Sequence, residues 1–143
     1  ADDWTALVNA GVWGGSGANP ATSLTIASVA EQFVPSVWLL QQNITIDSVQ
    51  YIMSADASTT MNLHVCSYSM TTGSGTTAGD LSSGAVIADH TSAITVGDDR
   101  VSNGTITIQT ADVDSGKAIL VFAENVGGTD DITVQVNIKY HLR

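Results

Sequence analysis

Few groups of residues in this sequence have the types and spacing that catalysis requires. Residues 14–18 come closest to the Gly-x-Ser-x-Gly motif of serine hydrolases, but they lack the last glycine and have no strand and helix around them. The three histidines fall on separate expected elements: His64 on an exposed face of a strand, His90 in a loop and His141 at the end of the last strand. We therefore expect no Ser-His-Asp triad.

One acidic segment shares residue types with two known kinds of site. Asp114-Ser115-Gly116 resembles the catalytic triplet of aspartic proteases, but that family places the triplet directly after an apolar strand, whereas Thr110-Ala111-Asp112 precedes this one and Lys117 follows it. The same segment, from Asp112, begins like a calcium-binding loop, yet Ala123 occupies the twelfth position, where a bidentate carboxylate is required. We interpret residues 114–116 as a turn in which Asp caps backbone groups and Gly adopts a positive φ.

Metal binding has little support elsewhere in the sequence. A structural zinc site needs about four ligands and often several thiolates, whereas Cys66 is the one cysteine. The acidic pairs Asp98-Asp99 and Asp130-Asp131 could hold Ca²⁺ between neighbouring loops, although solvated acids in turns are the usual case. We expect a protein that is not an enzyme, with no cofactor and no catalytic or metal site.

Charge and hydropathy narrow the possible partners. Fourteen acidic residues against four basic ones give a formal net charge of -10, which repels nucleic-acid phosphates and anionic lipid headgroups. The longest apolar run, residues 118–123, is far shorter than the roughly 20 residues that span a bilayer. The sequence thus predicts a soluble protein with neither nucleic acid nor membrane as partner. The lone cysteine leaves stability to packing or association.

The elements that must position any site are predicted to be strands. The chain has 143 residues, of which 43% are hydrophobic and 13% charged, and its polar residues are mostly Thr, Ser, Asn and Gly. From Ser23 onward apolar residues recur with a period of two, most regularly at 132–140. About eight or nine short strands separated by Gly-rich turns are typical of an all-β protein. We predict a jelly-roll-like antiparallel β-sandwich.

Two segments carry sharper predictions about the strands. Residues 44–53 alternate with a shift of face at Asp47 and Ser48, which indicates a β-bulge. Residues 61–68 alternate so that one face is apolar, which is typical of a sheet with a single core face. The residues expected to point away from that core are Asn62, His64, Cys66 and Tyr68.

Three further segments yield local predictions. The apolar run at 38–40 indicates a strand buried on both faces or covered by the N-terminal residues, with Trp38 in the core. Residues 71–83 contain several glycines and are expected to form a surface loop. Asn103-Gly104 predicts a turn in front of a strand at 105–108.

The N-terminal residues differ in composition from the rest, so we divide the chain into an arm, residues 1–22, and a β-sandwich domain, residues 23–143. Asp3 can cap a short helix that Gly11 would end. Fewer than about 12 residues rarely hold a helix in water, so its apolar face must dock on something. The expected partner-binding residues of the arm are Trp4, Leu7, Val8 and Trp13.

The start of the chain lacks the basic and apolar segments of a secretory signal. Ala1 is also the kind of small residue left when an initiator methionine is trimmed. Synthesis in the cytoplasm is therefore the simpler expectation.

The C-terminal part of the chain resembles a known class of proteins. From Asp114 it runs through a turn, an apolar strand at 118–123, a Gly-rich hairpin at 127–130 and an alternating strand at 132–140. This succession resembles small β-sandwich structural proteins of tailed-bacteriophage virions. The resemblance covers about the last thirty residues and transfers no functional residue. It implies a capsid decoration (cement) protein or a fibre subunit, usually a homotrimer without cofactor, assembled in the host cytoplasm onto the major capsid protein or another virion protein.

Two other functions remain open. A carbohydrate-binding or adhesive module would share the sandwich but needs exposed aromatic rings, which Trp4 and Trp13 could supply if neither a partner nor the chain's own sandwich covers them. A subunit of an extracellular filament could use the arm to add a strand to a neighbour. An enzyme ranks last.

Overall fold

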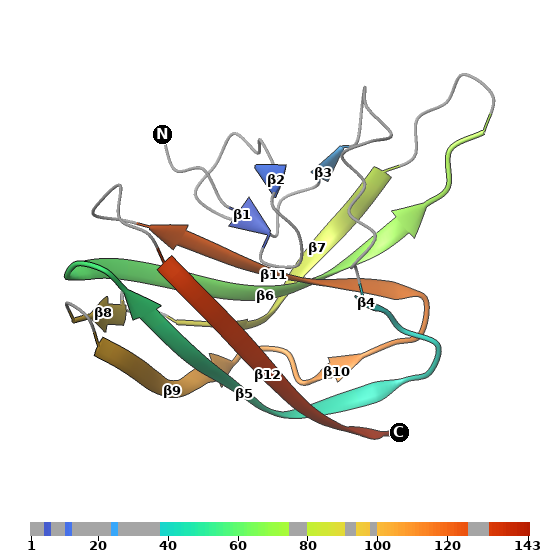
Figure 1. Ribbon diagram of the computed structural model, residues 1–143. Coiled ribbons are helices and arrows are strands. Elements are labelled where there is room, and N and C mark those ends of the chain that lie inside the picture. The colour runs from blue at the N-terminus through green and yellow to red at the C-terminus, as the bar shows by residue number, and fades with distance from the viewer. Residues whose placement is uncertain are drawn as a thin grey trace.

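The computed structural model describes residues 5–6, 11–12, 24–25, 38–74, 80–90, 94–97, 100–125 and 132–143. This part of the chain is all-β, and all its strand pairs are antiparallel (Figure 1). The strands are β1 (Thr5–Ala6), β2 (Gly11–Val12), β3 (Leu24–Thr25), β4 (Trp38–Leu39), β5 (Ile44–Ala55), β6 (Thr59–Thr71), β7 (Asp80–Asp89), β8 (Ile94–Val96), β9 (Arg100–Ile108), β10 (Asp112–Val113), β11 (Lys117–Asn125) and β12 (Ile132–Leu142).

The strands form two layers that face each other. In the first layer, sheet A, β6 lies between β7 and β11, and β8 pairs with the start of β6. In the second, sheet B, β5 lies between β9 and β12, and β10 pairs with its first residues. Two residue pairs between β7 and β9 join the sheets along one side, and on the other side sheet B ends in β12 (Figure 1). This arrangement confirms the predicted all-β antiparallel sandwich.

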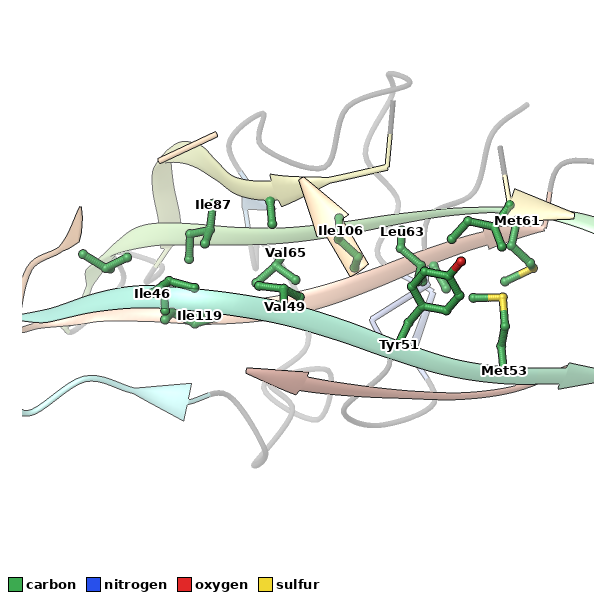
Figure 2. Packing of buried hydrophobic residues seen from close by; sticks show 14 of the residues in the cluster. Ile46, Val49, Tyr51, Met53, Met61, Leu63, Val65, Ile87, Ile106 and Ile119 are labelled. Carbon is green, nitrogen blue, oxygen red and sulfur yellow. The ribbon is translucent and has the colours of Figure 1, made fainter. Parts of the chain in front are cut away.

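A hydrophobic core fills the space between the two sheets (Figure 2). Alternate residues of β5 point into it because side chains of a strand alternate between its faces. They meet alternate residues of β6, of which Leu63 and Val65 are completely buried. The residues labelled in Figure 2 are Ile46, Val49, Tyr51, Met53, Met61, Leu63, Val65, Ile87, Ile106 and Ile119.

The outer face of sheet A is buried as well. Cys66 and Tyr68 are completely buried, and the ring of Tyr68 meets that of Phe122 edge-on, with centroids 6.3 Å apart. The prediction that β6 belongs to a sheet with a single core face is therefore wrong. On the same face, β11 places Ala118, Leu120 and Phe122 beside Tyr68, Cys66 and His64, so sheet A carries a second apolar cluster that the pattern of β6 alone does not reveal. We call this the outer core; its buried residues are Cys66, Tyr68, Leu81, Ala118, Leu120 and Phe122.

The bulge predicted within residues 44–53 is confirmed in β5. Ser48 lies opposite Lys139 and Ile46 lies opposite Tyr140, so Asp47 is the extra residue of β5. The insertion lets Ile46 and Val49, three residues apart, both point into the core.

Asn103-Gly104 does not form the predicted turn, because both residues lie inside β9 opposite Ile52 and Tyr51. A Cβ at Gly104 would lie 2.7 Å from Oη of Tyr51. The glycine thus makes room for a tyrosine ring rather than for a reversal of the chain.

Two other local predictions need correction. The loop predicted at 71–83 is too long, because β6 extends to Thr71 and β7 begins at Asp80. The run at 38–40 is not buried on both faces: Leu40 is buried, but Leu39 is 39% exposed and Trp38 is half-buried. β4 lies at the margin of sheet A, where one side of a strand meets solvent.

The helix predicted from Asp3 to Gly11 is wrong where the structure describes it. Thr5–Ala6 is β1, which pairs with Ala123 and Phe122 of β11 and with Gly11–Val12. A short helix leaves most of its backbone groups unbonded, whereas the margin of β11 offers them partners. Trp4, Leu7, Val8 and Trp13 lie outside the described residues, so their role remains a prediction. No helix of the described chain has the length and apolar character to cross a membrane.

Candidate docking site

The two sheets meet through an aromatic contact on the side of the sandwich opposite the β7–β9 junction. Trp38 of β4, in sheet A, packs on Tyr140 of β12, in sheet B, with ring centroids 5.1 Å apart and planes tilted by 52°. We call this side, between β4 and β12, the open side of the sandwich. Trp38 also packs against the core between the sheets, so its predicted core role is confirmed in part.

A groove of about 170 Å³ lies beside this aromatic pair. Its lining residues are Trp38, Leu39, Leu40, Gln41, Gln42, Ile44, Tyr140 and Leu142. Tyr140 is 45% exposed and Leu142 is 61% exposed. The lining is mainly aliphatic and aromatic, with the side-chain amides of Gln41 and Gln42, the Tyr140 hydroxyl and the Trp38 indole N–H as its polar side-chain groups, so it can receive an apolar side chain from outside.

The register of β12 explains why these side chains are both apolar and exposed. Tyr140 pairs with Ile46 and Leu142 pairs with Ile44, and both isoleucines point into the core. Opposite residues of an antiparallel pair share a face, so Tyr140 and Leu142 also project from the core side of sheet B. They are the part of that side that the sandwich leaves exposed.

Backbone hydrogen bonds hold the wall of the groove in place. The Leu40 amide donates to the Lys117 carbonyl at 3.0 Å, and the Gly116 amide donates to the Leu40 carbonyl at 2.8 Å. The Arg143 amide donates to the Asn43 carbonyl at 3.0 Å. The groove is therefore anchored both to the turn before β11 and to the C-terminal end of β12.

The acidic turn beside the groove binds the C-terminal arginine. Arg143 Nη2 lies 2.6 Å from Oδ1 of Asp114, and Nη1 lies 3.4 Å from Oδ2 of Asp112. Thr45 Oγ1 donates to Asp112 at 2.6 Å. Gly116 has a φ of 80°, which confirms the predicted turn. The carboxylates that suggested a protease triplet or a calcium loop thus form exposed ion pairs.

The three histidines lie in separate places, as expected. His141 Nδ1 is 2.8 Å from Asp47 Oδ1, and the His90 ring meets Tyr51 edge-on at 6.2 Å. His64 differs from the prediction of an exposed residue, because its side chain is only 15% exposed and lies 3.8 Å from Asp89. Burial lowers the pKa of His64, and the Asp89 carboxylate partly opposes that shift. In the ranges listed above, no three His, Cys, Asp or Glu side chains gather in a way that could hold a metal ion.

Cys66 provides a test of the outer core. Burial raises the pKa of its thiol to about 12; a hydrogen bond with Tyr68 partly opposes that shift, and the Asp89 carboxylate adds to it. Because the thiolate is the reactive form, we expect native protein at pH 8 to resist a thiol reagent such as Ellman's reagent, with reaction rising only as urea unfolds the chain. The unfolded thiol titrates near its ordinary pKa of 9.0. Stability should therefore fall as pH rises above about 9, where the unfolded state loses the proton first.

Rapid reaction of Cys66 in native protein at pH 8 would contradict its burial. A Cys66→Ala variant is the blank for the assay, and its unfolding free energy should lose less of its value between pH 9 and 11 than that of the parent.

No protein-family model, curated protein or solved structure matches this chain. Its class therefore rests on its own geometry: an all-β antiparallel two-sheet sandwich with an exposed apolar groove on its open side. Sequence reasoning missed the groove. The alternation of 132–142 was a signal that Tyr140 and Leu142 share a face with core residues, but it could not show that this end of the face is uncovered.

Proposed function

We propose that the protein is a non-enzymatic structural protein of a virion, either a capsid decoration (cement) protein or a head or tail fibre subunit. It acts through protein–protein contacts, as a homo-oligomer for which a trimer is the expected count. The observation that carries the protein-binding role is the exposed apolar groove in a chain of net charge -10. The virion role rests on the resemblance of the C-terminal strands.

An exposed apolar groove favours contact with another protein because it exposes surface that a partner can shield from water. Burying apolar area contributes roughly 25 cal/mol per Å², so even one inserted side chain adds measurable affinity. Leu39 and Leu142 are the exposed aliphatic residues at this groove. The partner that fits is a shell protein that offers an apolar side chain, rather than a basic surface that pairs with the acidic turns.

Replacement of Leu142 by lysine should weaken binding to the virion shell by about tenfold or more. The change removes apolar contact of about 1.5 kcal/mol or more and places a charge at the interface. Binding should be measured by cosedimentation with capsids lacking the protein. Ile52→Lys, at a position 44% exposed on β5, is the matched control and should bind like the parent.

Salt separates this mechanism from an electrostatic one. Exposed charge pairs are screened over a Debye length of about 10 Å at 0.1 M salt, whereas apolar contact is not. Binding should therefore persist at about 0.5 M salt. Release by salt, or equal binding by the Leu142→Lys variant, would contradict docking through the groove. Loss of binding in Trp13→Ala alone would assign the contact to the arm.

A carbohydrate-binding function is the second candidate, and the same groove supplies its argument. Trp38 and Tyr140 present aromatic rings beside the amides of Gln41 and Gln42, a combination that can stack on a sugar ring and bind its hydroxyls. A glycan array distinguishes the two functions. Strong signals that Tyr140→Ala abolishes would overturn the structural role in favour of a sugar-binding module.

A further inference from the structure

In the described part of the structure, β12 is the edge strand of sheet B. Among the described residues, β12 pairs with β5 alone, over all 11 of its residues. No residue of β12 is fully buried. Ile132, Val134, Val136 and Ile138 point toward the core but are only partly covered. Within the described part of the structure, the outer side of β12 therefore presents backbone groups with no strand partner, beside apolar side chains that more protein could cover.

Natural proteins usually protect an exposed edge strand with a lysine, a proline or a bulge. The one lysine of β12 is Lys139, near the C-terminal end of the strand. The β5 bulge at Asp47 lies beside the same end of β12. Residues 132–138 contain no charged residue and no proline. In a chain with a net charge of -10, this stretch can approach a second copy without direct charge repulsion.

The sequence of this stretch is almost the same in both directions. It reads Ile-Thr-Val-Gln-Val-Asn-Ile, centred on Gln135. Two such strands that run antiparallel about Gln135 place Ile132 opposite Ile138, Val134 opposite Val136 and Thr133 opposite Asn137. Residues opposite each other share a face of the sheet, so apolar side chains meet on the core side and polar side chains meet outside.

We propose that β12 pairs antiparallel with β12 of a second copy, about a two-fold axis at Gln135, and joins the two B sheets into one. The contact is isologous, so it makes pairs, in contrast to the trimer that the resemblance implies. It specifies a surface for self-association but does not depend on the virion role. Tyr140 and Leu142 lie beyond the paired stretch, so failure of this pairing and failure of groove docking are separate results.

Cross-linking tests the axis. Opposite residues of paired strands have Cβ atoms about 4.5–5.5 Å apart, so Gln135→Cys should give a covalent dimer with a short bis-maleimide. Gln50→Cys, on the same face of β5, is the control. Strands lie about 4.8 Å apart, so its two copies would be at least ~14 Å apart, beyond a short linker. Cys66 is buried in both variants and adds no background.

Charged substitutions at Gln135 test the same two-fold axis without a covalent cross-link. Gln135→Glu and Gln135→Lys each place two like charges across the axis, and each should raise the dimer dissociation constant by about tenfold. Mixing the two variants should restore the pair as a heterodimer. Gln135 is exposed, so both variants should keep the parent's unfolding temperature.

The register can be tested with two further variants. Thr133→Cys or Asn137→Cys alone should not cross-link, whereas their mixture should. A parent protein that stays monomeric in sedimentation at tens of micromolar and a Gln135→Cys variant that does not cross-link would together overturn the proposal. A dimer that neither Gln135 charge variant weakens would overturn it as well.

Discussion

Replacement of Phe122 by alanine is expected to lower the free energy of unfolding by about 3–5 kcal/mol. Phe122 is completely buried on the outer face of sheet A, where its ring meets Tyr68. Removing it takes away the apolar transfer free energy of the ring and leaves a cavity among strands that cannot close it. Because most domains are stable by only 5–15 kcal/mol, this single change should remove much of the stability.

Urea unfolding at low temperature, followed by far-ultraviolet circular dichroism, measures the loss. Leu63→Ala removes a completely buried residue from the core between the sheets and should cost about 2–5 kcal/mol, in the same range. Val101→Ala, at a position 69% exposed, is the control and should change stability by less than about 0.5 kcal/mol. A loss below about 1 kcal/mol for Phe122→Ala would mean that the outer core is not closed.

Replacement of Gly104 by alanine should destabilise the protein by about 1–3 kcal/mol, although alanine ordinarily suits a strand interior better than glycine. An added Cβ would lie 2.7 Å from Oη, 2.9 Å from Cζ and 3.0 Å from Cε1 of Tyr51. The tyrosine has little room to yield because it is buried and its ring meets His90 edge-on. The clash must therefore move the ring or the backbone of β9.

A double-mutant cycle isolates this clash from other effects of the alanine. Tyr51→Leu removes all three clashing atoms, so Gly104→Ala should cost much less in the Tyr51→Leu background than in the parent. Unfolding free energies of the four proteins give the coupling. Equal costs in both backgrounds would show that the ring is not what Gly104 accommodates.

Only part of the candidate site could be predicted, as Trp38 and Tyr140 on the open side of the sandwich show. The alternation of 132–140 puts Tyr140 on the same face as Ile132, Val134, Val136 and Ile138, and the structure shows that this is the core side of the strand. Trp38, about a hundred residues earlier in the chain, was assigned to the core on its apolar neighbours. Their contact depends on how two sheets stack, and a pattern within one strand carries no information about its neighbour in the other sheet.

Residues close together along the chain are sufficient to set several features of this fold. The recurrence of apolar residues with a period of two predicts strands, and the shift of face at Asp47 predicts the bulge. Asp114-Ser115-Gly116 predicts a turn with a positive φ at glycine. Each follows from local sterics and the alternation of side chains, which act over a few residues.

The tertiary structure sets the features that depend on strands distant in sequence. It placed Cys66 and Tyr68 in the outer core beside apolar residues of β11, which the sequence of β6 alone does not indicate. It made Thr5–Ala6 a strand, because β11 supplies these residues with a pairing partner, whereas the ends of an isolated helix leave backbone groups unbonded. Among the described residues it left β12 with a strand partner on one side only and the groove exposed, because burial depends on how the sheets pack and not on any one strand.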